Sequence, residues 1–206
     1  MVQQIPAKMR KGEATRRRIL VEALQLYSEK GVQNTPFQEI ADKIGITQAA
    51  LYKYFNNRDE LLKEAVLLAG EEGREFFKID PKQEAKMSEK EKFFHHVKMN
   101  IEWAQNGKPT NVGFLSLHYF ASQIKVIGEV HTEVMNLRVN RFKSYLQSLQ
   151  KEENLKIDNI NSLAVSIHNM LLGEMLEAYN HSGNETVKKR SERIFTNILR
   201  MLGSNS

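Results

Sequence analysis

The side chains best suited to recognising another molecule lie in a short stretch of the N-terminal third of the chain. Gln48 carries an amide that both donates and accepts hydrogen bonds, and Thr47 and Ala49 flank it. Such an amide pairs bidentately with adenine, and small methyl-bearing side chains suit contact with the methyl group of thymine. Gln38 offers a second amide for a flanking base or a phosphate. These residue types indicate a surface that reads the edges of DNA base pairs.

A first short helix precedes these residues. Thr35 is expected to cap its N-terminus, with Pro36 at the first helical position and Gln38 completing a capping box. Apolar residues recur at helical spacing and form one face, namely Phe37, Ile40, Ala41 and Ile44. The spacing predicts an amphipathic helix with a polar outer surface.

A glycine and a second short helix follow. Gly45 supplies the left-handed backbone that ends a helix, and Thr47 is expected to cap the next one. That helix turns Ala50, Leu51 and either Tyr54 or Phe55 toward a core. Two short helices joined by a tight turn form a helix-turn-helix, and the N-terminal residues of its second helix enter the major groove. Residues 35–55 are therefore predicted to be a DNA-reading motif.

Positive charge is concentrated near the N-terminus. The chain has a formal net charge of +5, and the basic residues of this region are Lys8, Arg10, Lys11, Arg16, Arg17 and Arg18. Only Glu13 opposes them in the first eighteen residues. A basic arm beside a DNA-reading motif suits contact with phosphates. A solvated tail is the alternative for the arm taken alone.

Two longer helices are expected around the motif. One covers residues 13–30 and ends at Gly31, and another begins at Asn57 and runs toward Phe77. The core predicted for this part comprises Ile19, Ala23, Leu26, Phe37, Ile40, Ala41, Ile44, Leu51 and Phe55.

Four motifs in this region resemble the N-terminal domain of the TetR family of bacterial regulators. They are TRRRIL (Thr15–Leu20), EKG (Glu29–Gly31), EIADKIGITQAALYKYF (Glu39–Phe55) and NRDELL (Asn57–Leu62). The resemblance covers about the first third of the chain. It implies phosphate contacts from Thr35, Tyr52, Tyr54 and Arg58, with Lys53 nearby. For Tyr54 a place in the core is the alternative.

The remaining two-thirds of the chain is predicted to be helical throughout, so the fold class is all-α with about nine helices. Helical segments are expected at 88–105, 112–127, 130–149, 160–179 and 185–202, and breaks at 80–88, 106–109 and 154–159. The segment at 112–127 is expected to be split, either by Gly113 or by a turn near Ser122. Ser88 and Glu91 have the spacing of a capping box. We divide the chain into a DNA-binding domain at 12–72 and an effector-binding and dimerisation domain at 73–206.

The larger domain is rich in aromatic residues and methionine. The resemblance implies a small-molecule pocket between its helices, and pockets are apolar with a few polar groups. The residues selected as candidates are Trp103, Phe114, His118, Tyr119, Phe120 and His168. For each of them, packing in the core is the simpler interpretation.

The last two helical segments each carry a broad apolar face. A pair of such helices packs either within the chain or against a second copy. The resemblance favours the second copy, in a four-helix homodimer interface. The interface candidates are Leu163, Ile167, Leu171, Met175, Ile194 and Ile198.

Several classes of function find no support in the sequence. Cysteine is absent, which excludes disulfides and cysteine-ligated zinc. The six histidines lack the spacing of a metal site, and no phosphate-binding loop or nucleophile motif is present. No apolar run is long enough to cross a membrane, and the N-terminus lacks a signal-peptide core. We expect a cytoplasmic protein that is not an enzyme, binds no metal or cofactor, and has no membrane partner.

Together these features favour a dimeric repressor that binds a palindromic operator in double-stranded DNA and is released by a small apolar or amphipathic effector. The alternative is a DNA-binding protein that a protein partner controls, or one with an architectural role and no small ligand. The effector, the operator and the regulated genes are not encoded in recognisable motifs.

Overall fold

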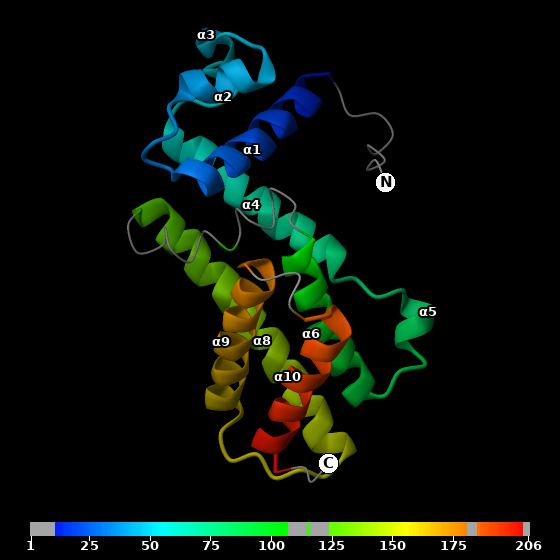
Figure 1. Cartoon of the computed structure of the whole chain (residues 1–206). Helices are drawn as coiled ribbons and strands as arrows, with labels where there is room; N and C mark the ends of the chain where they lie inside the picture. The colour runs from blue at the N-terminus through cyan, green and yellow to red at the C-terminus, as the bar shows by residue number, and fades with distance from the viewer. Residues whose placement is uncertain (1–10, 107–114, 116–123, 181–184, 204–206) are drawn as a thin grey trace. The chain divides into compact units, whose positions relative to one another are not determined.

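The computed structural model describes the chain outside residues 1–10, 107–114, 116–123, 181–184 and 204–206. Within these residues every regular element is an α-helix, which confirms the all-α prediction. The helices are α1 (Lys11–Lys30), α2 (Phe37–Ile44), α3 (Gln48–Leu51), α4 (Arg58–Phe76), α5 (Pro81–Glu84), α6 (Glu89–Gln105), α8 (Lys125–Glu152), α9 (Ile160–Asn180) and α10 (Val187–Met201) (Figure 1). None of them is both long and apolar enough to cross a membrane.

The chain forms two compact units, and each is considered by itself. The first comprises Met1–Glu71 and Lys108–His131, and the second comprises Glu72–Gly107 and Thr132–Ser206. Helices α4 and α8 contribute residues to both units.

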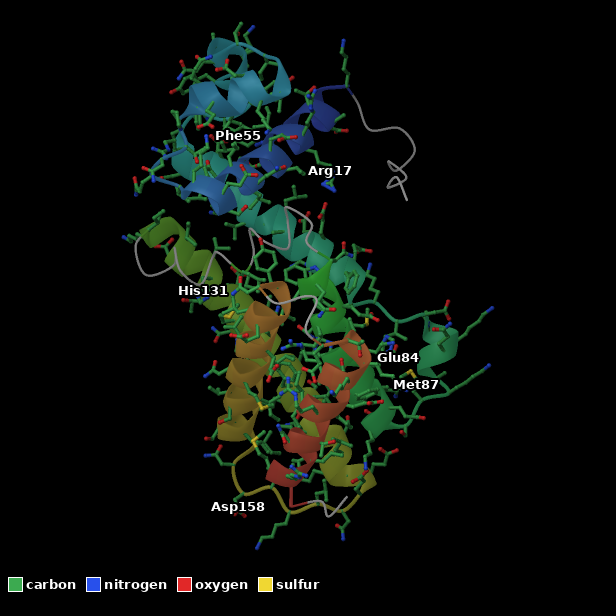
Figure 2. The ribbon with its side chains drawn as sticks, viewed as in Figure 1. Arg17, Phe55, Glu84, Met87, His131 and Asp158 are labelled. Atoms are coloured by element: carbon green, nitrogen blue, oxygen red, sulfur yellow. The ribbon has the colours of Figure 1, made fainter. Side chains whose placement is uncertain are left out.

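The core of the first unit lies among α1, α2, α3 and α4. All nine core residues predicted from the sequence are buried, and Ile19, Ile40 and Leu51 have no exposed surface. Full burial of such a side chain stabilises the fold by about 1.5–3 kcal/mol. Phe55, labelled in Figure 2, is buried beneath the guanidinium of Arg16, which lies 4.2 Å from the centre of its ring. The apolar periodicity of these short segments thus predicts their packing correctly.

The second unit is built on α6, which packs against both α9 and α10. Its fully buried side chains include Phe93 and Ile101 of α6 and Phe142 and Leu146 of α8. At the N-terminus of α6, Ser88 Oγ accepts a hydrogen bond from the backbone N–H of Glu91, and the Glu91 carboxylate accepts one from the backbone N–H of Ser88. The predicted capping box is therefore confirmed.

Two helix boundaries differ from expectation. Residues 130–149 belong to the longer helix α8, which begins at Lys125 and passes through Gly128 without a break. A single glycine inside a helix costs only about 1 kcal/mol, so neighbouring residues carry the helix across it. Within the predicted break at 80–88, the Asp80 carboxylate accepts hydrogen bonds from the backbone N–H groups of Lys82 and Gln83, and Pro81 starts the one-turn helix α5.

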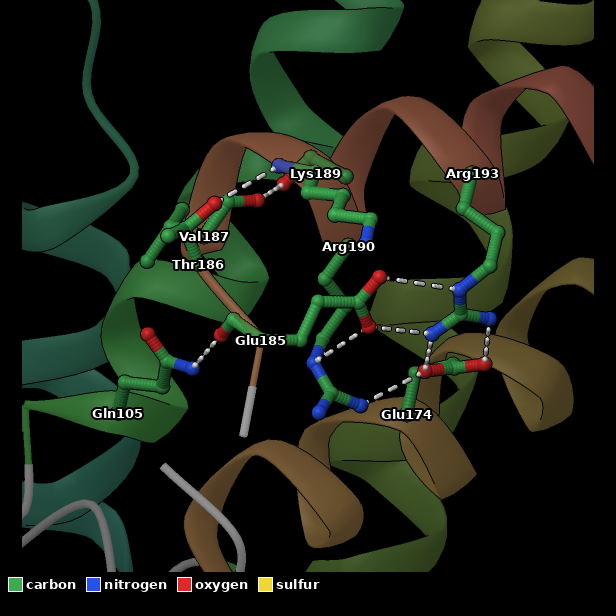
Figure 3. A network of polar contacts seen from close by, with 9 residues as sticks. Gln105, Glu174, Glu185, Thr186, Val187, Lys189, Arg190 and Arg193 are labelled. Atoms are coloured by element: carbon green, nitrogen blue, oxygen red, sulfur yellow. Dashed lines mark hydrogen bonds and ion pairs between the residues drawn. The ribbon is translucent and has the colours of Figure 1, made fainter. Parts of the chain in front are cut away.

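An ionic network joins the start of α10 to α9 (Figure 3). Arg193 forms hydrogen bonds of 2.9–3.0 Å with both oxygens of Glu174 and one of 3.0 Å with Glu185. The buried Arg190 adds a bond of 3.1 Å to Glu174. Hydrogen bonding to Arg193 lowers the pKa of both glutamates, and the glutamates in turn raise the pKa of Arg193. The network holds α9 and α10 in one arrangement.

The predicted dimer residues on α9 and α10 require correction. Ile167, Leu171, Met175, Ile194 and Ile198 have at most 1% of their surface exposed in a single copy of the chain, and only Leu163 is half-buried. Their periodic face is used inside the protomer because α6 packs against both helices. Periodicity identifies the apolar face of a helix, but it does not say which element covers that face.

Candidate DNA-binding interface

The turn between α2 and α3 is closed by the backbone of Gly45. Gly45 has a φ of +73°, in the left-handed region that residues with a Cβ rarely adopt. Its N–H donates to the carbonyl of Asp42, and the N–H of Ile46 donates to that of Ala41. This pair of bonds is a Schellman motif, which ends α2 and redirects the chain within two residues. The predicted helix-turn-helix is therefore present.

Thr47 caps the N-terminus of α3. Its hydroxyl oxygen accepts a hydrogen bond of 3.1 Å from the backbone N–H of Ala50, which confirms the predicted cap. Loss of such a cap costs about 1 kcal/mol. The hydroxyl of Thr47 is thus used within the motif, and its methyl group takes no part in the cap. Gln48 and Ala49 are then the first two helical residues.

The loop before α2 is held by three side chains. Thr35 Oγ1 donates to the Gly31 carbonyl at 2.9 Å, and Asn34 Nδ2 donates to the Lys30 carbonyl at 2.9 Å. The guanidinium of Arg58, at the start of α4, donates to the Val32 carbonyl. These bonds attach the carbonyls of Lys30, Gly31 and Val32, at and just after the end of α1, to side chains of the loop and of α4, and they hold the point at which α2 begins.

Both roles expected of Thr35 are therefore corrected, and Arg58 has an additional role in the loop. Thr35 does not cap α2; Pro36 occupies the cap position without a side-chain hydrogen bond. Thr35 is fully buried, so no surface is left for the implied phosphate contact. Arg58 is half-buried and bonded to Val32, and it lies close enough to Tyr27 to lower the pKa of the phenol, although burial dominates and raises that pKa to about 12. The structure gives both residues a role in the loop.

The amide of Gln38 has a fixed orientation. Its Nε2 donates to Asp42 Oδ1 at 2.6 Å, one helical turn further along α2, and both residues are exposed. Asp42 did not figure among the predicted site residues. The sequence signal for the Gln38–Asp42 pair was its spacing of four residues, because residues four apart are neighbours on the surface of a helix. The carbonyl oxygen of Gln38 takes no part in this bond.

The other predicted contact residues form a polar surface on and after α3. Thr47, Ala49, Tyr52 and Lys53 are exposed, whereas Gln48 and Tyr54 are half-buried. The ring of Tyr52 packs against that of Phe37, with 5.0 Å between the centroids, and half of the residue's surface stays open. Buried Phe37 thus holds a phenol in place at the surface. A hydroxyl presented in this way suits a phosphate oxygen.

The predicted ligand residues divide into two groups. Trp103 and His168 lie in the second unit and are buried, with 2% and 4% of their surfaces exposed. Phe114, His118, Tyr119 and Phe120 lie outside the described residues. A surface groove of about 520 Å³ is present in the first unit instead, lined by Leu20, Glu60, Lys63, Glu64, Leu67, Leu68 and Glu71. Neither Trp103 nor His168 is among the described residues that line that groove.

A family model described as "Bacterial regulatory proteins, tetR family" matches residues 19–65, which contain this helix-turn-helix. Residues 19–65 are thus similar to the DNA-binding part of TetR-family regulators. Over 60 residues it is 42% identical to the HTH-type transcriptional regulator AcrR of Shigella flexneri, covering 28% of each chain. Over 55 residues it is 42% identical to SrpR of Pseudomonas putida, covering 27% of this chain and 25% of that protein. These matches to the TetR-family regulators thus span about a quarter of their length.

Solved structures show that the TetR likeness in fold continues through the whole chain. A TetR-like transcriptional regulator from Rhodococcus sp. RHA1 superposes with a TM-score of 0.76 at 17% identity, covering 96% of this chain and all of that one. AibR, solved in complex with isovaleryl coenzyme A and operator DNA, superposes with a TM-score of 0.69 at 20% identity, covering 88% of this chain and 96% of that one. At these identities the comparison establishes the fold of the second unit.

Proposed function

We propose that this protein is a dimeric TetR-family transcriptional regulator, a repressor that a small apolar or amphipathic ligand releases from a palindromic operator. The observation that carries the proposal is the presentation of Gln48 and Ala49 at the start of α3, behind a closed Schellman turn. In this proposal residues 12–72 form the DNA-binding domain and residues 73–206 the effector-binding and dimerisation domain.

Base contacts are assigned to Gln38, Thr47, Gln48 and Ala49, and phosphate contacts to Tyr52, Lys53 and Tyr54. Base edges require groups at the front of the reading helix, whereas phosphates are met by hydroxyl and cationic groups around it. Thr35 is left out because its side chain is fully buried and bonded within the domain. Arg58 keeps its phosphate contact in this proposal, because the bond to Val32 uses one of the several N–H groups of its guanidinium. The similarity to AcrR, an HTH-type transcriptional regulator, and to AibR, solved with operator DNA, supports a regulator of transcription.

Dimerisation is assigned to the outer face of α9. Val165, Leu176 and Tyr179 expose 44%, 37% and 37% of their surfaces, and with Leu172 between them they follow one helical stripe. Exposed apolar residues scattered singly need no explanation, but an aligned set is typical of an interaction surface. A second copy would cover this face and supply the second reading head that a palindrome requires.

Selection of bound sites from random double-stranded DNA tests the proposal. Palindromes are expected, with half-site centres about one helical turn, roughly 34–36 Å, apart or somewhat more. One dimer should bind each site. Enrichment of asymmetric single half-sites bound by one monomer would contradict the dimeric form of the proposal, and the absence of any enriched sequence would contradict it altogether.

A further inference from the structure

Gln38 and Asp42 form a polar pair on the outer face of α2. Gln38 Nε2 donates to Asp42 Oδ1 at 2.6 Å, and both residues are exposed, whereas the apolar residues of α2 are buried on its other face. Within the described part of the chain, this is the only hydrogen bond that either side chain makes. An exposed pair of this kind adds little to the stability of a helix, so its importance lies in the groups that it offers to another molecule.

Asp42 determines which end of the Gln38 amide faces it. A carboxylate accepts hydrogen bonds, whereas an amide carries an acceptor oxygen at one end and two N–H donors at the other. Turned over, the amide would bring its own oxygen against the carboxylate, and two acceptors repel each other. The Gln38 amide therefore keeps its NH2 group toward Asp42, and its carbonyl oxygen lies at the other end of the planar group.

Gln38 lies in the first turn of α2, close to the reading helix. Phe37, the residue before it, packs against Tyr52 at the end of α3, with 5.0 Å between the ring centroids. The first helix of a helix-turn-helix crosses the DNA backbone while the second lies in the major groove. A long side chain at this place meets either a phosphate or the edge of a base that flanks those read by α3.

The negative charge of Asp42 disfavours the phosphate. Phosphates are bound by N–H and O–H donors and by positive charge. The Gln38–Asp42 pair instead offers acceptors, namely the Gln38 oxygen and the remaining lone pairs of the carboxylate. The donors in the major groove are the amino groups of adenine and cytosine, whereas guanine and thymine present only acceptors there. The pair therefore suits adenine or cytosine.

We propose that Asp42 is a positioning residue for sequence readout, which holds the Gln38 amide so that its oxygen accepts a hydrogen bond from the amino group of a flanking adenine or cytosine. This deepens the proposed function and rests on it, since it names the bases that Gln38 selects. Guanine or thymine at that place would set its own acceptor against the Gln38 oxygen. The amide could turn over to donate to these bases only by losing its bond to Asp42.

Selection of bound sites from random double-stranded DNA, repeated with variants of the full chain, tests the proposal. The position read by Gln38 is defined as the one whose base preference Gln38→Ala abolishes. There the unaltered protein should favour adenine and cytosine over guanine and thymine by about fivefold or more, the lower end of the range for a base contact. A preference for guanine or thymine, or the absence of any such position, would overturn the proposal.

Asp42→Asn should reduce this preference to within about twofold, because an asparagine both donates and accepts and so lets the Gln38 amide turn over. Asp42→Glu keeps an acceptor at the same position of the helix and should retain the preference. Asp59→Asn, at an exposed aspartate of α4, is the matched control: it removes the same charge and should leave every base preference unchanged. An unchanged preference in Asp42→Asn would overturn the proposal.

Two measurements separate positioning from other roles of Asp42. In a protein that already carries Gln38→Ala, Asp42→Asn should alter no base preference, because Asp42 acts through the amide. A change there would mean that Asp42 reads the base itself. Asp42→Asn alone should bind random DNA at least as tightly as the unaltered protein, because a negative charge has been removed near the phosphates. Weaker binding of random DNA by this variant, with its fold verified by circular dichroism, would show a structural role instead.

The same selection separates this inference from the proposed function. If the unaltered protein enriches no sequence, the proposed regulator fails. If it enriches palindromes whose base preferences are the same for Gln38→Ala and Asp42→Asn, the regulator stands and the positioning role of Asp42 fails.

Discussion

The guanidinium of Arg58, at the start of α4, donates a hydrogen bond to the backbone carbonyl of Val32, in the loop that precedes α2. Residues far apart in sequence are thereby joined beside the helix-turn-helix. Thr35 and Asn34 hold the neighbouring carbonyls of Gly31 and Lys30. These bonds connect the loop to α4 and to the end of α1, and they position the start of α2.

Arg58→Ala should therefore act on stability. A hydrogen bond from a charged donor to a partly buried carbonyl contributes about 1–2 kcal/mol, so the free energy of unfolding of this variant should fall by that amount. Denaturant unfolding followed by circular dichroism measures the change. Lys53→Ala, at an exposed residue, is the control and should shift stability by no more than about 0.5 kcal/mol. Equal stabilities for the two variants would show that the bond to Val32 contributes nothing.

Gln48→Ala should change sequence preference. The variant should lose about 1–3 kcal/mol of affinity for the selected operator and accept other bases at one position of each half-site, because the amide reads a base edge. Lys53→Ala should instead weaken binding to all sequences alike and reduce the salt dependence of binding. Fluorescence anisotropy with the operator and with scrambled DNA measures both. Gln48 is not a base reader if its loss weakens both DNAs equally.

Leu176→Arg should separate the dimer. A cation in the middle of the exposed stripe of α9 would have to be desolvated in the interface, which costs several kcal/mol. Sedimentation equilibrium should show monomers for this variant, and its operator affinity should drop steeply. Leu67→Arg, at a comparably exposed leucine of α4, is the control and should remain dimeric. A dimeric Leu176→Arg protein would exclude this face as the interface.

The ionic network at α10 should make stability depend on acid pH. The folded state lowers the pKa of Glu174 below its ordinary value of 4.5, mainly through the hydrogen bond from Arg193. The stabilisation is therefore complete above about pH 4.5 and is lost as the pH falls through the lower folded-state value. At neutral pH, Glu174→Gln should destabilise the protein by about 1–2 kcal/mol, since the carboxylate is partly shielded from water.

Calorimetric melting temperatures of Glu174→Gln and the unaltered protein should converge as the pH is lowered below 4.5. Glu192→Gln is the control, because its pair with Lys188 is exposed and 3.9 Å long. Such a surface pair contributes little at any pH. If the melting temperature of Glu174→Gln stays below that of the unaltered protein by the same amount at acid pH, the charge of Glu174 is not what stabilises α10.

The sequence by itself determined the features that depend on interactions between residues close together in the chain. The helices, the left-handed turn at Gly45, the cap at Thr47 and the capping box at Ser88 depend on residues within a few positions of one another, so their signals are complete in the sequence. The same holds for the three-helix core, whose apolar spacing has only one way to be buried among such short segments.

The tertiary structure decided which other residues each of these side chains contacts. Thr35 has the residue type of a helix cap, yet folding buries it and its hydroxyl bonds to the Gly31 carbonyl. The bond from Arg58 to the Val32 carbonyl likewise joins residues that only folding brings together. Ile167 and Ile198 have the spacing of a dimer face, yet α6 packs against their helices inside the protomer. The meeting of Arg138 with Asn100 and Met175 has no local signal, because it joins three helices that only packing brings together.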